Sequence, residues 1–271
     1  FFCIGLFVLA TASQPVGKAP LASSDLGRLL FEDPILSSDQ SISCASCHLP
    51  DFAFSDTLVF SMGVGGQFGT RNTPAITNMS ARSAFFWDGR AETLETQVVQ
   101  PIENPVEMNL PLPMAIERLR QSARYLAYFK AIYGQAPDTI TLADALASFV
   151  RTLETADTPF DRWMQGNESA MSTSAVRGRQ VFMNKGKCFD CHFSPDFTGD
   201  EFRNIGLFDG KKWNDPGRFA LSKDSSDLGK FKVPGLRNVA VTGPYMHDGS
   251  FSTLRDVIDY YDQPNQFAPH S

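Results

Sequence analysis

Apolar residues recur at helical spacing in several stretches of the chain, and loops rich in aromatic residues, Gly and Pro separate these stretches. Residues 26–31 (LGRLLF) have this spacing, and a longer amphipathic stretch covers residues 114–133. Thr141 is a candidate N-cap for a further helix that continues to about Glu154. The period-2 alternation that marks strands is scarce. The pattern therefore predicts a mainly α fold with little β structure.

One order of motifs occurs twice along the chain. A stretch of helical spacing leads into a Cys-x-x-Cys-His pentapeptide, and an Arg-Asn pair, an Asp-Gly pair and a Thr-Leu pair follow. The first copy ends in FWDGRAETL (86–94) and the second in MHDGSFSTL (246–254). Residues 166–174 between the copies are polar, as in a linker. The repeat predicts an N-terminal domain over residues 20–165 and a C-terminal domain over residues 166–271.

The N-terminal residues differ from the rest of the chain. The run FFCIGLFVLATASQP (1–15) has about ten apolar residues followed by small ones, and it lacks a starting Met. We interpret residues 1–12 as a truncated signal peptide. The alternative is a short membrane anchor, but a span needs roughly 20 apolar residues. An exported, periplasmic protein is therefore expected, with no stable membrane span after cleavage.

Composition narrows the class of partner. Of the 271 residues, 42% are hydrophobic and 20% are charged, which is typical of globular proteins. The formal net charge of −6 disfavours a nucleic-acid surface, so no nucleic-acid partner is expected. Apart from Cys3 in the predicted signal, every cysteine lies in one of the two pentapeptides: Cys44, Cys47, Cys188 and Cys191.

The pentapeptides CASCH and CFDCH place two thiols and an imidazole at a fixed spacing. Such thiols can add across the two vinyl groups of a haem, and the next residue then places its imidazole beneath the iron. Two disulfides, a zinc ribbon or a redox dithiol are alternatives, but none needs His after the second Cys. Two covalently attached haem c groups are therefore predicted, with His48 and His192 as iron ligands. Spacing leaves the opposite ligand open among His247, His270, the methionines and the tyrosines.

Further motifs accompany the haem motifs: RNTPAITN (71–78), FFWDGRAETLETQ (85–97), PIENPVEM (101–108), TPFDRWMQG (158–166) and GPYMHDGSFSTL (243–254). On these residues the chain resembles the bacterial di-haem cytochrome c peroxidases and their MauG-like relatives, from about Asp25 to Tyr261. The resemblance implies two c-type cytochrome domains packed about a pseudo-two-fold axis. It also implies a peroxidase-family oxidoreductase that reacts with hydrogen peroxide at the open N-terminal haem, with the C-terminal haem relaying electrons.

The resemblance also implies roles for individual residues. Trp87 matches the tryptophan between the two haems. Glu107 and Gln97 match the pair above the peroxidatic iron, where the carboxylate would move the peroxide proton and the amide would orient the peroxide. One interdomain calcium ion is also implied, and oxygen ligands of this kind suit it. Its matching ligands are Asn72 and, through their backbone carbonyls, Thr242 and Pro244.

Two positions depart from the peroxidases that need reductive activation. Those enzymes carry a loop histidine on the peroxidatic haem at the position of Val64, so a permanently open iron is expected here. Typical peroxidases place a methionine on the relay haem where this chain has Tyr261, as MauG-like members do. A phenolate ligand favours storing oxidising power. The chain stops at Ser271, so the C-terminal domain is expected either to be truncated or to close differently.

Three functions remain open. The main interpretation is peroxide reduction with a small redox protein, a cytochrome c or a cupredoxin, as electron donor. The second is MauG-like oxidation of a residue such as Trp on a partner protein, through a bis-ferryl state, and Val64 and Tyr261 favour it. The third is a non-catalytic di-haem electron carrier, against which Glu107 and Gln97 argue. Peroxidases of this family are often dimers, so a homodimer is one expected assembly.

Overall fold

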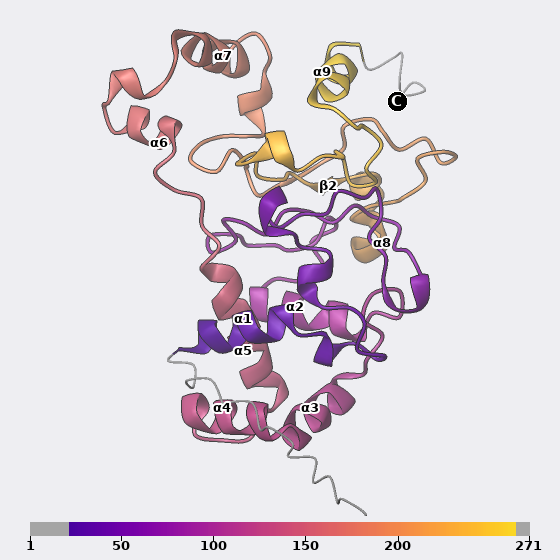
Figure 1. The fold of residues 1–271 in the computed structure, drawn as a ribbon. Helices are drawn as coiled ribbons and strands as arrows, with labels where there is room; N and C mark the ends of the chain where they lie inside the picture. The colour runs from indigo at the N-terminus through magenta and orange to yellow at the C-terminus, as the bar shows by residue number, and fades with distance from the viewer. Residues whose placement is uncertain (1–21, 264–271) are drawn as a thin grey trace, which may run out of the picture.

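The computed structural model describes residues 22–263, so the predicted signal peptide lies outside the described part of the chain. The mainly α prediction is confirmed (Figure 1). The described helices are α1 (Ser23–Glu32), α2 (Leu94–Glu103), α3 (Leu112–Gln121), α4 (Ala123–Tyr133), α5 (Thr139–Arg151), α6 (Pro159–Met164), α7 (Thr173–Met183), α8 (Phe219–Ser222) and α9 (Leu254–Asp262). Within residues 22–263 the only sheet pairs β1 (Phe202–Arg203) with β2 (Phe231–Lys232), antiparallel. None of the helices in that range is long and apolar enough to cross a bilayer.

Two helix boundaries differ from the sequence prediction. The amphipathic stretch 114–133 forms two helices, because Ser122 ends α3 and also caps α4, where its hydroxyl accepts a hydrogen bond from the Tyr125 amide in the first turn. The predicted N-cap at Thr141 is wrong, since the cap is Asp138, whose carboxylate accepts from the Thr141 amide at 2.8 Å. An earlier acidic residue takes the cap because a carboxylate also favours the positive end of the helix dipole.

The two halves of the chain have very different apolar cores. In the first half, residues 22–165, helices α1 to α5 enclose a large cluster in which Leu26, Leu30 and Phe129 are fully buried. In the second half, residues 166–263, the buried apolar cluster comprises Leu207, Phe251 and Tyr260. Long loops connect its helices (Figure 1). So small a cluster leaves the second half dependent on polar contacts and on whatever covers its remaining apolar surface.

Helices α1 and α5 cross with unusually close backbones. A Cβ on Gly27 would lie 1.9 Å from the Ala145 carbonyl oxygen. Gly27→Ala should therefore lower the melting temperature, because overpacking costs about 1–3 kcal/mol and outweighs a helix-propensity gain of at most ~1 kcal/mol. Gly69→Ala is the control, since no atom lies within 4 Å of its added methyl. Thermal unfolding followed by circular dichroism should give a lower melting temperature for Gly27→Ala than for Gly69→Ala. Equal melting temperatures would mean that α1 and α5 can move apart to accommodate the methyl group without loss of stability.

The repeated motifs fold in the same way twice. Antiparallel bridges join Phe85 to Ala91 in the first copy and Tyr245 to Phe251 in the second. A capping threonine then begins a helix in each, Thr93 for α2 and Thr253 for α9. The helix before the predicted boundary, α6, packs on the second half, where the Phe160 ring lies 4.8 Å from that of Phe197. The division into two domains at residue 166 stays a prediction.

Candidate functional site

The first pentapeptide forms one tight helical turn. Residues Cys44–Ser46 are a 3-10 turn, and the His48 amide donates to the Cys44 carbonyl at 2.9 Å. The His48 Nδ1 lies 2.7 Å from the Phe54 carbonyl oxygen. A carbonyl only accepts, so Nδ1 carries the proton and Nε2 keeps its lone pair for a metal. Burial lowers the pKa of His48, which keeps the imidazole neutral as ligation requires.

The second pentapeptide repeats this geometry. Residues Cys188–Asp190 form a 3-10 turn, and the His192 amide donates to the Cys188 carbonyl at 2.9 Å. The His192 Nδ1 lies 2.9 Å from the Phe197 carbonyl oxygen, and burial lowers the pKa of this imidazole too. Both accepting residues, Phe54 and Phe197, have a φ of 57°. Each motif therefore presents two thiols and a lone pair on Nε2 from a single turn.

Two of the alternatives to haem attachment, a pair of disulfides and a zinc ribbon, are not formed in the described part of the chain. The four cysteines of the pentapeptides are free, and none is paired in a disulfide. Between residues 22 and 263, no group of three or more His, Cys, Asp and Glu side chains is placed to hold a metal ion. A four-cysteine zinc ribbon would need all the thiols at one point. The pairs instead belong to separate turns in the two halves.

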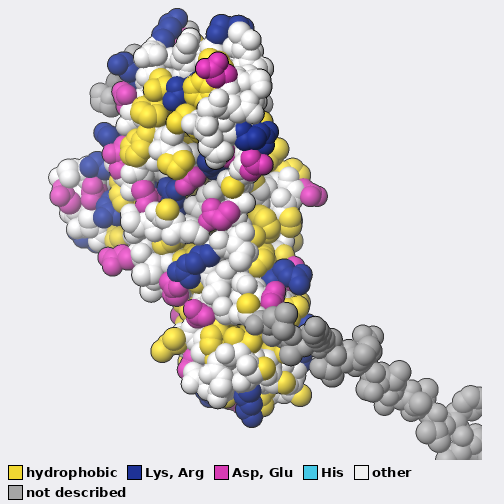
Figure 2. Space-filling model, turned by 90° about the vertical axis from the view of Figure 1, so that its left-hand side faces the viewer, with side chains coloured by type: hydrophobic (Ala, Val, Ile, Leu, Met, Phe, Trp, Pro, Cys, Tyr) yellow, Lys and Arg dark blue, Asp and Glu magenta, His cyan; other side chains and the backbone are white. Residues whose placement is uncertain are grey.

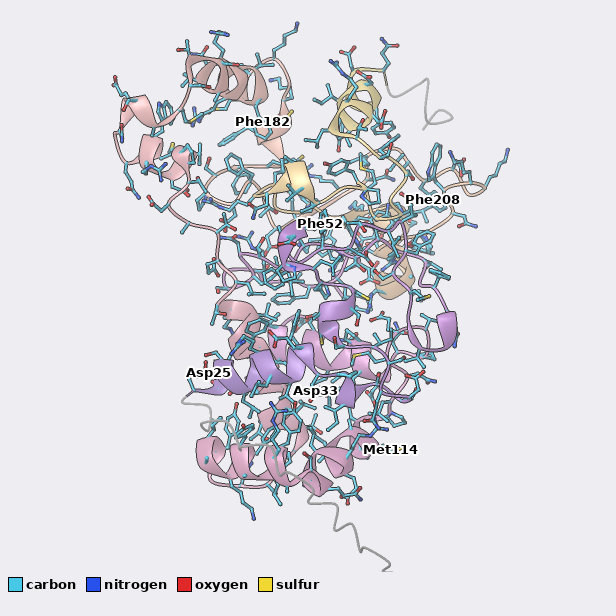
Figure 3. The ribbon with its side chains drawn as sticks, viewed as in Figure 1. Asp25, Asp33, Phe52, Met114, Phe182 and Phe208 are labelled. Atoms are coloured by element: carbon cyan, nitrogen blue, oxygen red, sulfur yellow. The ribbon has the colours of Figure 1, made fainter. Side chains whose placement is uncertain are left out.

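Apolar side chains beside both motifs remain exposed, as a porphyrin would require. Helix α7, which leads into the second motif, buries none of its residues, and Val181 is 55% exposed. Phe182 is the next residue of this helix, and Phe52, just after the first motif, lies where the halves meet (Figure 3). On one face of the molecule, apolar and charged side chains are interspersed (Figure 2). The donor atoms and these apolar surfaces fit two covalently held haem groups.

Glu107 lies beside the first motif. Burial is the main cause that raises the pKa of the Cys44 and Cys47 thiols, and the charge of Glu107 adds a small further increase to both, which places the carboxylate in their vicinity. Burial raises the pKa of Glu107, and the Asn104 amide, which donates to its Oε1 at 2.5 Å, partly offsets this. The carboxylate borders an open cleft, lined by Arg90, Gln100, Pro101, Glu103, Asn104, Pro105 and Glu107. A partly desolvated carboxyl in a cleft is suited to proton transfer.

The loop that carries Val64 lies against the Glu107 backbone. The Val64 amide donates to the Glu107 carbonyl at 2.8 Å, and Val64 is buried. Gly63 permits this approach, because a Cβ there would lie 2.2 Å from the Val106 carbonyl oxygen. Val64, which stands where peroxidases that need reductive activation carry a histidine, therefore lies next to Glu107. Gln97, half-buried on α2, is not among the residues that line the Glu107 cleft.

Trp87 lies where the two halves meet. Its indole Nε1 donates to the Asn72 carbonyl at 2.8 Å, and its own carbonyl accepts from the Lys232 amide at 2.7 Å. The Asn72 amide donates in turn to the carbonyl of His247, which occupies the equivalent position in the repeat. The His247 ring stacks on Phe231 at 3.7 Å. The equivalent residues of the two copies thus meet across Asn72.

The structure places two of the three predicted calcium ligands, Asn72 and Pro244, in the neighbourhood of Val59. Asn72 is buried, and its amide Nδ2 donates to the Val59 carbonyl at 3.2 Å. Both Val59 and Pro244 would touch a Cβ on Gly249, at 3.1 Å and 3.3 Å. The Thr242 hydroxyl donates to the Val239 carbonyl at 3.4 Å. The calcium site stays a prediction.

Helix α9 places Tyr261 beside the second motif. The side chain is 54% exposed, yet desolvation of the phenol, with smaller contributions from Tyr260, Cys191 and Cys188, raises its pKa to about 12. The thiols that hold the second haem are therefore its neighbours. Of the other ligand candidates, His247 is buried against Phe231, and His270 lies outside the described residues.

Sequence reasoning missed the carbonyls that fix the two histidine rings. A signal was present, because a Pro-Asp-Phe tripeptide follows each pentapeptide, as residues 50–52 and 195–197. The accepting carbonyl belongs to the tripeptide itself in the second copy, Phe197, and to Phe54 in the first. Backbone acceptors leave no side-chain signature, so only the fold identifies them.

Comparison with known proteins gives consistent relatives. A family model described as di-haem cytochrome c peroxidase matches residues 22–169. The chain is 41% identical over 248 residues to methylamine utilization protein MauG of Methylorubrum extorquens, covering 90% of this chain and 69% of that protein. It is 34% identical over 265 residues to cytochrome c551 peroxidase of Nitrosomonas europaea, covering 96% and 79%. The crystal structure of a MauG-like protein associated with microbial copper homeostasis superimposes with a TM-score of 0.82 at 30% identity, covering 96% and 83%.

These relatives and the geometry agree on the class of protein. The family match covers more than half of the chain, and the relatives include both cytochrome c peroxidases and MauG. Both pentapeptides present the donor set that covalent haem attachment needs. The chain therefore belongs to the di-haem cytochrome c peroxidase family and is an oxidoreductase with two haem c cofactors.

Proposed function

We propose that the N-terminal haem, on His48, is the site of reaction with hydrogen peroxide and that Glu107 is its acid–base group. The observation that carries the proposal is the position of Glu107: a partly desolvated carboxylate, close to Cys44 and Cys47, at the edge of an open cleft. The C-terminal haem, on His192, would relay electrons. When bound, each haem supplies an iron centre that exchanges electrons with peroxide or with the other haem.

Four residues would then have separate roles in the reaction. Glu107 Oε2 would take a proton from one peroxide oxygen and return it to the other, which can then leave as water with the electron pair of the O–O bond; the electrons would come from the two haem groups. Asn104 holds the other carboxylate oxygen, so the accepting oxygen has a fixed direction. Gln97 would orient the peroxide through its amide. Val64 offers no ligand where activated peroxidases place histidine, which keeps this face open.

Trp87, the calcium ligands and Tyr261 extend the proposal. Trp87, whose indole donates to Asn72 and whose backbone carbonyl accepts from Lys232 of the second half, is the residue through which the two sites would exchange electrons. A calcium ion on Asn72, Thr242 and Pro244 would fix the same junction. Tyr261 would be the second ligand of the relay iron. We further propose export to the periplasm, and a small redox protein or a protein substrate as partner.

A second candidate function, MauG-like oxidation of a partner protein, is favoured by two positions. Tyr261 lies near the second motif, and Val64 stands beside Glu107. A phenolate stabilises oxidised iron better than a thioether does, so the relay site would hold oxidising equivalents rather than accept electrons from a cytochrome.

Mixing ferric protein with peroxide, with and without reduced cytochrome c, separates the functions. A peroxidase consumes the reduced cytochrome rapidly in steady state. A MauG-like enzyme consumes it slowly and shows a near-infrared charge-resonance band instead. Two six-coordinate low-spin haems that do not respond to peroxide would contradict both and would indicate an electron carrier.

A further inference from the structure

We propose that Arg82, in the first half, positions His192, the iron ligand of the second haem, by holding the loop whose carbonyl accepts the His192 Nδ1 proton. The inference rests on the haem-binding role of His192 but not on peroxide chemistry at Glu107. It makes the first half a structural determinant of the relay site.

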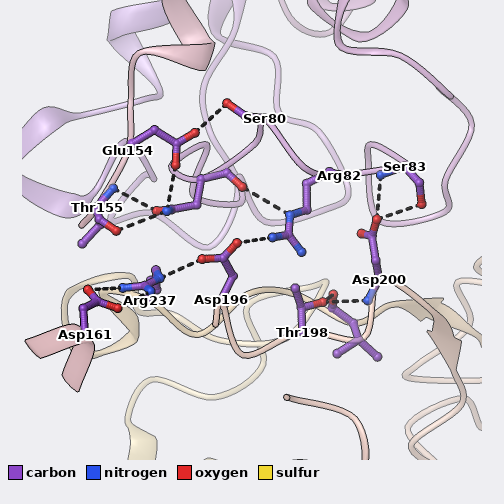
Figure 4. Close-up of polar contacts among 12 residues, drawn as sticks. Ser80, Arg82, Ser83, Glu154, Thr155, Asp161, Asp196, Thr198, Asp200 and Arg237 are labelled. Atoms are coloured by element: carbon purple, nitrogen blue, oxygen red, sulfur yellow. Dashed lines mark hydrogen bonds and ion pairs between the residues drawn. The ribbon is translucent and has the colours of Figure 1, made fainter. Parts of the chain in front are cut away.

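The loop in question is residues 193–200, directly after the second pentapeptide. Phe197 supplies the carbonyl that fixes the His192 ring at 2.9 Å, and Asp196 is its neighbour. The Asp196 carboxylate binds two guanidinium groups, one oxygen accepting from Arg82 and the other from Arg237 at 2.8 Å (Figure 4). The residue next to the critical carbonyl is therefore held by a charge from each half of the chain.

Arg82 is itself rigidly placed. Only 8% of its side chain is exposed, and its Nε donates to the Asn78 carbonyl at 3.2 Å. The Asn78 side chain is in turn fixed to the end of the first half, where Oδ1 accepts from the Thr155 amide at 3.1 Å and Nδ2 donates to Glu154 at 2.9 Å (Figure 4). Removing Arg82 would leave Asp196 with the guanidinium of Arg237, so the loop would lose the charged contact that reaches Asp196 from the first half.

The far end of the loop is held by the next residue of the first half. The Asp200 carboxylate accepts from both the amide and the hydroxyl of Ser83, at 2.6 Å and 2.8 Å (Figure 4). Between the two anchors, the Thr198 hydroxyl donates to the Val233 carbonyl at 2.7 Å. Arg82 and Ser83 thus hold the middle and the far end of the loop that orients His192.

After the first haem motif, no described ion pair holds the corresponding carboxylate. The Phe54 carbonyl, which fixes His48, follows an alanine, Ala53. In the first Pro-Asp-Phe tripeptide, Asp51 occupies the position that Asp196 occupies in the second. Asp51 is exposed and forms no ion pair with any described residue. The contacts of Arg82 with Asp196 and of Ser83 with Asp200 are therefore specific to the second motif and are not required for every pentapeptide of this kind to form its turn.

The expected consequence is electronic as well as structural. A hydrogen bond from Nδ1 raises the basicity of the ligating imidazole, which stabilises ferric iron. Loosening the Phe197 carbonyl weakens that bond, so the reduction potential of the relay haem should rise. The potential of the first haem should not change.

The test compares Arg82→Gln with Arg151→Gln in the complete, haem-loaded protein. Arg151 is the matched control because its ion pair with Glu95 is in the same half but exposed, at 41% and 37%. The measurements are the two midpoint potentials and amide hydrogen exchange across residues 193–200. For Arg82→Gln we expect a higher relay potential and exchange about 10-fold faster or more, with both haems retained. Arg82→Lys should restore part of both effects.

An Arg82→Gln relay potential equal to that of Arg151→Gln would overturn the proposal, even if exchange accelerates. Should Arg82→Gln fail to fold, Asp196→Asn removes the charge that both Arg82 and Arg237 bind while conserving volume, and the same outcomes decide. A protein that proved unreactive toward peroxide would still have two measurable potentials. Failure of the proposed function and failure of this inference are therefore distinguishable.

Discussion

Replacing Glu107 by Gln is expected to slow the reaction of ferric protein with hydrogen peroxide by roughly 10²-fold or more. Gln keeps the size of the side chain and can still contact Asn104, but it cannot accept the peroxide proton. Both haem groups should stay attached, because neither pentapeptide is altered. Stopped-flow absorbance measures the second-order rate constant directly. A rate constant equal to that of the parent protein would remove Glu107 from the mechanism.

The matched control is Glu103→Gln. Glu103 lines the same cleft but is exposed, and its carboxylate accepts from the Leu112 amide at 3.2 Å. The same loss of charge there should leave the rate constant nearly unchanged.

The pH profile gives a second signature of Glu107. A base acts when it is deprotonated, and burial raises the pKa of this carboxyl above its ordinary value. The rate constant should therefore fall as pH is lowered through that raised pKa, and the Glu107→Gln variant should lack this fall.

Replacing Tyr261 by Met should change the spectrum of the relay haem and raise its potential by on the order of 10² mV, since axial ligands set haem potentials over ≈ 0.8 V. A thioether stabilises ferric iron less than a phenolate does. Spectroelectrochemistry of the haem-loaded protein measures both changes. The matched control is Ile258→Met, on the same helix and 60% exposed. Identical spectra for Tyr261→Met and the parent protein would show that Tyr261 is not an iron ligand.

The parts of the site that the sequence predicts best are those set by local geometry. Two thiols and an imidazole at fixed spacing must lie on one turn, and both motifs form that turn. The duplicated Thr-Leu pairs likewise begin α2 and α9 as N-caps, because a threonine hydroxyl satisfies a free amide at a helix start. Local patterns of this kind predict local structure.

The parts that the sequence does not predict depend on contacts between distant residues. Nothing near Arg82 in the sequence indicates that it pairs with Asp196, and nothing near Gly27 indicates that the Ala145 carbonyl lies against it. The break at Ser122 was also missed, since helical spacing continues across it and the serine cap competes with the helix interior. The unequal cores follow from tertiary packing and not from composition.

The most direct test of the central claim is a pyridine haemochrome assay on protein expressed with the haem-attachment machinery. If both pentapeptides hold haem through their cysteines, the assay will report about two c-type haems per chain. One haem per chain, or a colourless protein, would contradict the account.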